Sequence, residues 1–338
     1  MLKVLVTGGA GFIGSNFVHH ALAAHDDWQV TTLDKLTYAG RMENLQDVID
    51  HPRHAFVQGD VADAAVAAPL VRASDIVVHF SAETHVDRSI LNAGEFITTD
   101  VFGTFVLLEA ARQAPNLRRF VQISTDEVYG SVPDGSSREG DELRPRNPYS
   151  ASKAGADRLA YSYWATYDVP VIMTRASNNY GPNQFPEKVI PLFITNAVDD
   201  VPVPLYGDGL NERDWLHVSD HCRALDLLIE AGTSGEVYNI GAGHPIANAV
   251  LTRRILQLLR KPESLIRHVA DRPGHDRRYS LDTTKLQSIG WKPQVPFEEG
   301  LAGTVEWYRD NEWWWRPIKH EDAAFKKYYQ AQYGTRQP

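Results

Sequence analysis

Cysteine is almost absent from this chain, which has one cysteine, Cys222, among 338 residues. A single cysteine excludes a disulfide within the chain and is typical of a protein of the reducing cytoplasm. The chain also lacks an excess of positive charge. Its net charge of −9 argues against a non-specific nucleic-acid binder. No apolar run approaches the roughly 20 residues that a membrane-spanning helix needs, so no membrane association is expected.

Other absences narrow the class of protein further. The sequence contains no internal repeat or low-complexity tract. We identify no H-x-x-x-H or Cys/His spacing of the zinc-binding type among the histidines, so no metal is expected. The apolar start, MLKVLVTGGAGFIG, lacks the cationic region and cleavage site of a signal peptide, and we interpret it as a strand.

What the chain does contain is an alternation of short apolar runs and helical patterns. Segments with helical spacing, such as Gly14–Ala24 and Phe96–Ala114, lie between runs rich in Val, Ile or Phe. This alternation predicts an α/β fold with a Rossmann-like, doubly wound parallel sheet, whose ligands bind at the carboxyl ends of the strands. The six candidate strands of the first half are KVLVTG, WQVTTLD, HAFVQGD, DIVVHFSA, RRFVQIS and VPVIMTR.

After Arg175 the pattern changes to loops rich in Pro and Gly, and GEVYNIG near residue 238 has the composition of a strand that returns to the sheet. We therefore predict two interleaved units. Residues 1–176 with about 214–242 form a dinucleotide-binding domain, and about 177–213 with 243–330 form a smaller mixed α/β substrate-binding lobe. The segment beyond Trp313 is rich in Trp, Tyr and Lys without a clear pattern.

A glycine-rich turn, TGGAGFIG, follows the first candidate strand and precedes a helix. Gly8, Gly11 and Gly14 allow a tight turn and let backbone N–H groups approach a pyrophosphate. Asp34 ends the next strand, where a carboxylate can bind ribose hydroxyls and repel a 2′-phosphate, which favours NAD over NADP. Asp60 ends the third strand, near the expected adenine edge. A merely structural turn is the alternative, and the combination favours dinucleotide binding.

The segment NPYSASK places Tyr149 and Lys153 four residues apart on one helix face, after Pro148 at the helix start. A nearby ammonium and a positive nicotinamide ring would favour the phenolate and bring the tyrosine pKa toward neutrality. An amphipathic helix with a surface lysine is the alternative. The position after the fifth strand favours a catalytic pair.

The fifth strand ends in ISTDEVYG, a hydroxyl followed by two acids, Thr125, Asp126 and Glu127. A solvated turn or a helix cap would explain a random Asp-Glu pair. Beside Tyr149 and Lys153 we instead expect two carboxyl groups of different pKa, one acting as acid and one as base.

These motifs identify the chain as similar to the extended short-chain dehydrogenase/reductase family, through TGGAGFIG, Thr125 and YSASK. Longer motifs resemble those of the dTDP-glucose 4,6-dehydratases, from the first residues to about Trp307. They are SAETHVDRSI, ISTDEVYG, NNYGPNQFPEKVIPLFI, GDGLNERDWLHVSDHCRA and DRPGHDRRYSLD. The resemblance implies NAD as cofactor, dTDP-glucose as substrate, and a homodimer formed through Phe96–Ala114 and Tyr149–Tyr167.

The resemblance also supports roles for the catalytic residues. Tyr149 takes the C4 hydroxyl proton during oxidation, while Thr125 bonds the C4 oxygen. Glu127 removes the C5 proton and a protonated Asp126 donates to the departing C6 hydroxyl. Hydride then returns to C6 and gives a 4-keto-6-deoxy sugar.

The same resemblance implies the binding residues. The diphosphate requires local cations, for which Lys188, Arg213, Arg272 and His275 are candidates, whereas Arg277 and Arg278 are equally well explained as surface charges. The expected cofactor contacts are Gly8, Gly11, Phe12, Ile13, Gly14, Asp34, Lys35, Thr37, Asp60, Val61, Phe80, Ser81, Ala82, Thr99, Tyr149, Lys153 and Asn179. The expected substrate contacts are Thr84, Asn178, Lys188, Val189, Pro204, Tyr206, Arg213, Asn248, Arg272 and His275.

One position departs from the family pattern, because Asp100 stands where relatives have an asparagine that orders a helix kink and a water beside the lysine. Three alternatives remain open at this point. The chain could be a dehydratase for a UDP-linked sugar, a 4-epimerase, or a non-catalytic NAD-binding regulator. The complete set from Thr125 to Lys153 argues against the last.

Overall fold

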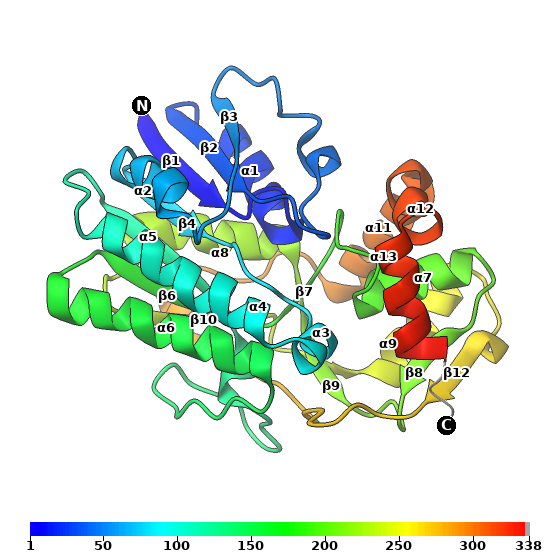
Figure 1. Ribbon diagram of the computed structural model, residues 1–338. Coiled ribbons are helices and arrows are strands. Elements are labelled where there is room, and N and C mark those ends of the chain that lie inside the picture. Colours follow the sequence, from blue (N-terminus) through cyan, green and yellow to red (C-terminus); the bar gives the residue numbers. More distant parts are fainter. Residues whose placement is uncertain (335–338) are drawn as a thin grey trace.

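The structure is a computed structural model that describes residues 1–334, and a seven-stranded parallel sheet lies at its centre (Figure 1). The strand order is β10-β6-β5-β4-β1-β2-β3. The strands predicted from the apolar runs are all present, and the GEVYNIG strand pairs with β6. The strands are β1 (Leu2–Thr7), β2 (Trp28–Asp34), β3 (His54–Gln58), β4 (Ile76–His79), β5 (Arg119–Thr125), β6 (Val171–Ala176) and β10 (Val237–Ile240).

Helices cover both faces of this sheet, so the predicted doubly wound α/β fold is confirmed. Side chains of β1 alternate between two apolar cores, with Val4 and Val6 in one and Leu5 in the other. The first core contains residues of α1 and α8, such as Phe17 and Leu225. The second contains residues of α2, α5 and α6. These helices are α1 (Phe12–Ala24), α2 (Ala64–Arg72), α5 (Gly103–Ala111), α6 (Pro148–Tyr167) and α8 (Val218–Ala231).

The direction of winding reverses at β1, because β2 pairs with one edge of β1 and β4 with the other. Such a reversal opens a crevice at the carboxyl ends of the strands, where α/β proteins bind their ligands. Thr7, Asp34 and Thr125 end three of these strands. The predicted site residues therefore come to one edge of the sheet.

The remaining strands form two small sheets, in the orders β11-β9-β7 and β12-β8. They share an apolar core with the C-terminal helices. The predicted boundary between the two units, at about residue 214, falls inside strand β9. The division of the chain into two units stays a prediction. These elements are β7 (Asn178–Tyr180), β8 (Val203–Tyr206), β9 (Glu212–His217), β11 (Pro245–Ala247), β12 (Ile266–Val269), α3 (Val86–Leu91), α7 (Val189–Val198), α9 (Asn248–Leu258), α10 (Thr284–Ser288) and α11 (Phe297–Asp310).

One predicted helix is divided into three, and a segment for which no structure was predicted is helical. The segment expected as one helix, Phe96–Ala114, consists of α4 (Gly94–Phe96), a π-helix (Ile97–Phe102) and α5, which ends at Ala111. The tail without a clear pattern is helical, in α12 (Glu312–His320) and α13 (Ala323–Tyr329), which lie near α7 in Figure 1. No helix within residues 1–334 is long and apolar enough to cross a lipid bilayer.

Candidate active site

A glycine-rich turn joins β1 to α1 at the crevice. Gly8 has a φ of +70°, and a Cβ on it would lie 2.6 Å from the backbone nitrogen of Ser81. A Cβ on Gly14 would clash with the carbonyl oxygen of Gly8. Side chains at these positions would therefore distort the turn that leads into the N-terminus of α1, where N–H groups and the helix dipole favour a pyrophosphate.

Asp34 ends β2 beside this turn and holds it in place. Its carboxylate accepts hydrogen bonds from the N–H groups of Ala10 (2.9 Å) and Leu36 (2.8 Å). Burial raises the pKa of Asp34, and the two hydrogen bonds oppose the rise. The remaining lone pairs can accept from ribose hydroxyls. At the end of β3, Asp60 forms an ion pair of 2.6 Å with Lys35.

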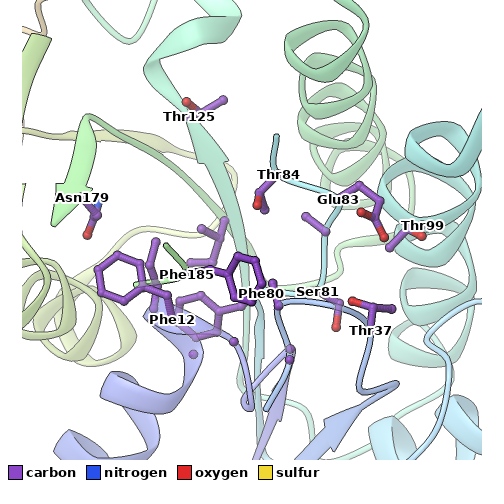
Figure 2. Close-up of a pocket in the computed structure, with 18 of the residues that line it drawn as sticks. Phe12, Thr37, Phe80, Ser81, Glu83, Thr84, Thr99, Thr125, Asn179 and Phe185 are labelled. Atoms are coloured by element: carbon purple, nitrogen blue, oxygen red, sulfur yellow. The ribbon is translucent and has the colours of Figure 1, made fainter. Parts of the chain in front are cut away.

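One cavity follows the carboxyl ends of the strands, and every residue predicted to contact the cofactor lines it. Figure 2 shows Thr125 at a strand end, with the rings of Phe12, Phe80 and Phe185 around the same space. Some buried polar atoms of the lining, such as Nε2 of His221, have no hydrogen-bond partner within residues 1–334. Apolar walls with such polar atoms suit a dinucleotide, so the residues present fit NAD.

The paired acids follow β5 directly and begin a 3₁₀ turn, Asp126–Tyr129. Thr125 Oγ1 donates to Oδ1 of Asp126 at 3.1 Å and accepts from the N–H of Glu127 at 3.3 Å. Asp126 is 2% exposed, and burial, together with the charge of Glu127, raises the pKa of Asp126 well above its ordinary value. Burial thus favours the protonated form of Asp126, while Glu127 lines the cavity.

Tyr149 and Lys153 lie on the first turns of α6, whose start is fixed by Pro148 and by a capping box between Asn147 and Ser150. Both side chains line the cavity, at the position predicted from the sequence. The capping box fixes the helix start and hence the depth at which the tyrosine enters the cavity.

We expected Lys153 and a nicotinamide ring to lower the pKa of Tyr149, but the residues of the chain by themselves do not lower it. Burial, followed by the charges of Glu127 and Asp100, raises the pKa of Tyr149 well above its ordinary value. The ammonium of Lys153 donates to the carbonyl of Ile123 at 2.7 Å, and burial lowers the pKa of this lysine. The phenolate therefore needs the positive charge of a bound ligand as well as the lysine.

Asp100 lies inside the π-helix and is 1% exposed. Its Oδ1 accepts from the N–H of Glu83 at 2.8 Å, and its Oδ2 lies 2.6 Å from Oγ of Ser152. The same Ser152 oxygen lies 2.8 Å from the carbonyl oxygen of Tyr149. Burial raises the pKa of Asp100 to about 7, although the charge of Lys153 acts against the rise. Asp100 is thus connected to the first turn of α6 through Ser152.

A second cavity adjoins the first, and every residue predicted to contact the substrate lines it. Lys188 donates to the carbonyl of Thr84 at 2.6 Å, and Arg272 lies 3.7 Å from the carboxylate of Asp87. Burial and the charge of Arg272 lower the pKa of His275 to about 4. The cavity thus presents three cations, Lys188, Arg213 and Arg272, together with the carboxylates of Asp87, Glu127 and Glu187.

The two cavities share a short stretch of lining. Thr84, Glu127, Asn178, Glu187 and Lys188 line both. Glu127 thus lies where a group bound in the second cavity would meet a group bound in the first.

Several lining residues were missed from the sequence. Glu187 accepts hydrogen bonds from Tyr38 (2.8 Å) and Arg88 (3.0 Å), although it stands next to the predicted Lys188 in a motif that was recognised. Tyr333 lines the second cavity from the helical tail. Tyr279 lines neither cavity, but its hydroxyl oxygen lies 3.5 Å from Glu127; it lay in a recognised motif, yet no signal linked it to the acids.

One correction concerns the histidines, because His217 and His221 are four residues apart, a spacing that can bind a metal. His217 caps α8 through Ser219, and Nδ1 of His221 lies 2.9 Å from Oδ1 of Asn179. Within residues 1–334 no group of three His, Cys, Asp or Glu side chains could hold a metal ion.

Comparisons with known proteins agree with this geometry. The family model for "GDP-mannose 4,6 dehydratase" matches residues 5–304. A dTDP-glucose 4,6-dehydratase of Streptomyces niveus is 52% identical over 96% of this chain and 97% of the relative. The crystal structure of a dTDP-glucose 4,6-dehydratase from Streptomyces venezuelae, with NAD bound, has a TM-score of 0.92 at 51% identity, covering 94% of this chain and 100% of that one.

A more distant structure, the UDP-glucose 4-epimerase of Thermus thermophilus in complex with NAD, has a TM-score of 0.84 at 32% identity, covering 92% of this chain and 100% of that one. The fold is thus shared with epimerases, whereas the near-full-length relatives at about half identity are dehydratases. The chain belongs to the GDP-mannose 4,6-dehydratase family of NAD-dependent sugar-nucleotide enzymes and, within it, to the dTDP-glucose 4,6-dehydratases.

Proposed function

We propose that this protein converts dTDP-glucose into dTDP-4-keto-6-deoxyglucose and water, with NAD as its bound cofactor. The observation that carries the proposal is that Glu127 lines both cavities, with Tyr149 and Lys153 in the first, while its neighbour Asp126 is buried and accepts a hydrogen bond from Thr125. An epimerase needs only the oxidation apparatus, whereas a dehydratase also needs an acid and a base for the loss of water.

The loss of water requires C4 to be oxidised first, because a C5 hydrogen becomes acidic only next to a carbonyl. NAD, when bound, accepts the C4 hydride and returns a hydride to C6. Tyr149 takes the C4 hydroxyl proton, and Thr125 bonds the C4 oxygen. Glu127 then removes the C5 proton, while the buried Asp126 gives its proton to the departing C6 hydroxyl.

The second cavity would hold the nucleotide. Its cations Lys188, Arg213 and Arg272 offset the charge of a diphosphate in a protein that is acidic overall. The aromatic ring of Tyr206 lies 6.0 Å from that of His275, and it would give the nucleobase an apolar wall.

Incubation of the purified protein with dTDP-glucose and, separately, UDP-glucose tests the proposal. We expect dTDP-glucose to lose the mass of one water and to give the alkali-induced absorbance of a 4-keto sugar, faster than UDP-glucose does. Faster reaction of UDP-glucose would reassign the nucleotide. Formation of a C4 epimer without loss of water, or cofactor binding without any reaction, would overturn the proposal.

We also propose a homodimer formed through the outer faces of the π-helix, α5 and α6. Figure 1 shows α5 and α6 side by side along the sheet. Large apolar side chains are exposed there, namely Ile97 (55%), Phe102 (48%), Phe105 (40%), Tyr161 (39%) and Tyr167 (49%). A second copy would cover them. Light scattering should give the mass of two chains for the wild type and of one for Phe105→Glu, and a monomeric wild type would contradict this.

We further propose that the protein works in the cytoplasm, since its cysteine, Cys222, is buried and unpaired. Cell fractionation with an antibody against the protein tests this location. Recovery outside the cytoplasmic fraction would refute it.

A further inference from the structure

A buried phenol lies between two carboxylates at the edge of the site. Tyr279 is 2% exposed, and its hydroxyl oxygen is 2.8 Å from Oδ2 of Asp276 and 3.5 Å from Oε2 of Glu127. Asp276 is 1% exposed and lies outside the residues that line either cavity. The mechanism above uses Glu127 but neither of the other two side chains.

The ring of Tyr279 is held rigidly in this position. The guanidinium of Arg213 lies over the ring, 4.3 Å from its centre. The same guanidinium donates to the backbone carbonyl of Asp276 at 2.9 Å, and Asn211 donates to that carbonyl at 3.1 Å. The short contact between Tyr279 and Asp276 is therefore fixed from both sides.

Counting protons assigns a direction to the hydrogen bonds. A phenol has one proton, and the carboxylate of Asp276 at 2.8 Å is a far better acceptor than that of Glu127 at 3.5 Å. The other oxygen of Asp276, Oδ1, accepts from Arg146 at 3.0 Å, which balances its charge. The Tyr279 oxygen consequently presents a lone pair, and no proton, toward Glu127.

We propose that Asp276 is a positioning residue for the elimination step, which keeps the Tyr279 hydroxyl proton turned away from Glu127. This inference rests on the proposed function. Glu127 then receives no hydrogen bond from Tyr279 that would satisfy its carboxylate and weaken it as a base. Once Glu127 has taken the C5 proton, its new O–H can donate to the waiting lone pair of Tyr279. Asp276 thereby keeps the Glu127 carboxylate free to act as a base, and it also leaves an acceptor for the Glu127 proton after abstraction.

The substitution Asp276→Asn should reverse this arrangement. Arg146 can only donate, so the amide oxygen must face Arg146 and the amide NH₂ must face Tyr279. The phenol would then accept from the amide and donate its proton to Glu127. A hydrogen bond to a charged group is worth enough to slow proton abstraction by about 10- to 100-fold. C4 oxidation, in which Tyr279 takes no part, should change much less.

Single-turnover kinetics with dTDP-glucose separate the two steps. The near-ultraviolet absorbance of the reduced nicotinamide should rise at nearly the wild-type rate in Asp276→Asn and decay about 10- to 100-fold more slowly. The double variant Asp276→Asn with Tyr279→Phe should eliminate water no more slowly than Tyr279→Phe alone, because no phenol proton remains to be redirected. Asp282→Asn, a matched control whose carboxylate binds Arg138 and the N–H of Thr284, should behave as the wild type.

Thermal unfolding shows whether each variant is folded. If Asp276→Asn is not folded, Asp276→Ala replaces it in the kinetic experiment. In Asp276→Ala the Tyr279 proton has Glu127 as its nearest carboxylate, so the same delayed decay is expected. Equal slowing of both steps, an unchanged decay, or a further slowing by Asp276→Asn in the Tyr279→Phe background would overturn the inference. A wild type that releases no water from dTDP-glucose would instead refute the proposed function.

Discussion

Replacing Asp100 by asparagine should change how the stability of the protein depends on pH. The pKa of Asp100 is raised from 3.8 to about 7, mainly by burial. The folded protein therefore favours the protonated carboxyl group. Proton counting agrees, because the hydroxyl proton of Ser152 cannot serve both Tyr149 O and Asp100 Oδ2, at 2.8 and 2.6 Å. A protonated Asp100 can donate to Ser152 and satisfies both contacts.

The sign and size of the effect follow from this shift. A carboxyl group with a raised pKa contributes stability that is fully present below its unfolded pKa of 3.8 and is lost as the pH rises through about 7. At about 1.36 kcal/mol per pKa unit, the loss is at most about 4 kcal/mol. The side-chain amide of the Asp100→Asn variant would not titrate, yet it can accept from the N–H of Glu83 and donate to Ser152.

Urea unfolding of the wild type and Asp100→Asn across this pH range tests the reasoning. The free energy of unfolding of the variant, relative to that of the wild type, should increase as the pH rises and level off above about pH 8. Asp282→Asn is an opposite control, because hydrogen bonds from Thr284 lower the pKa of Asp282. A difference that is constant with pH, or that decreases as the pH rises, would show that Asp100 is not held as a neutral acid.

Three further predictions concern the catalytic base, the cofactor turn and a buried ion pair. Glu127→Gln should stop water loss but not C4 oxidation, so substrate addition should leave a lasting absorbance of reduced nicotinamide; an unaltered rate of water loss removes Glu127 from its role. Gly14→Ala should lower the content of bound NAD in purified protein, because its Cβ would clash with the Gly8 carbonyl, and normal content would argue against this role of the turn. Asp157→Asn should destabilise the fold by about 3–5 kcal/mol in urea unfolding, because it leaves the buried Arg175 charge uncompensated, and a loss below about 1 kcal/mol would contradict this.

The sequence predicted the sheet well because strands that are buried on both faces are continuous apolar runs. The inner strands β1 and β4 carry that signal, at Val4–Val6 and Ile76–Val78, whereas the edge strand β3 has no buried residue. The residues predicted to contact cofactor and substrate stand at strand ends or in long motifs, and the structure brings them together as the lining of two cavities. The π-helix could not be predicted, since an i→i+5 turn around Asp100 leaves no trace in hydrophobic periodicity.

Contacts between segments that are far apart along the chain could not be predicted from the sequence either. The tail helices mix Trp and Tyr with Lys and Arg without a clear period, and only their packing shows that Trp314 and Trp315 are buried. Likewise, Tyr279 lies 152 residues from Glu127, and no local pattern joins them. Side-chain networks of this kind depend on how segments far apart in the sequence pack together, which neither propensity nor spacing specifies.

Burial has opposite consequences for the two halves of the chemistry. It raises the pKa of Asp126 and so keeps the proton that the leaving hydroxyl needs. It also raises the pKa of Tyr149 and thereby opposes the loss of the proton that C4 oxidation needs. A positive charge close to the phenol can offset that cost, and an oxidised nicotinamide ring carries one whereas a reduced ring does not. In the proposed mechanism the desolvated site therefore keeps the proton of Asp126 whether or not a cofactor is bound, but favours the Tyr149 phenolate only when an oxidised cofactor is bound.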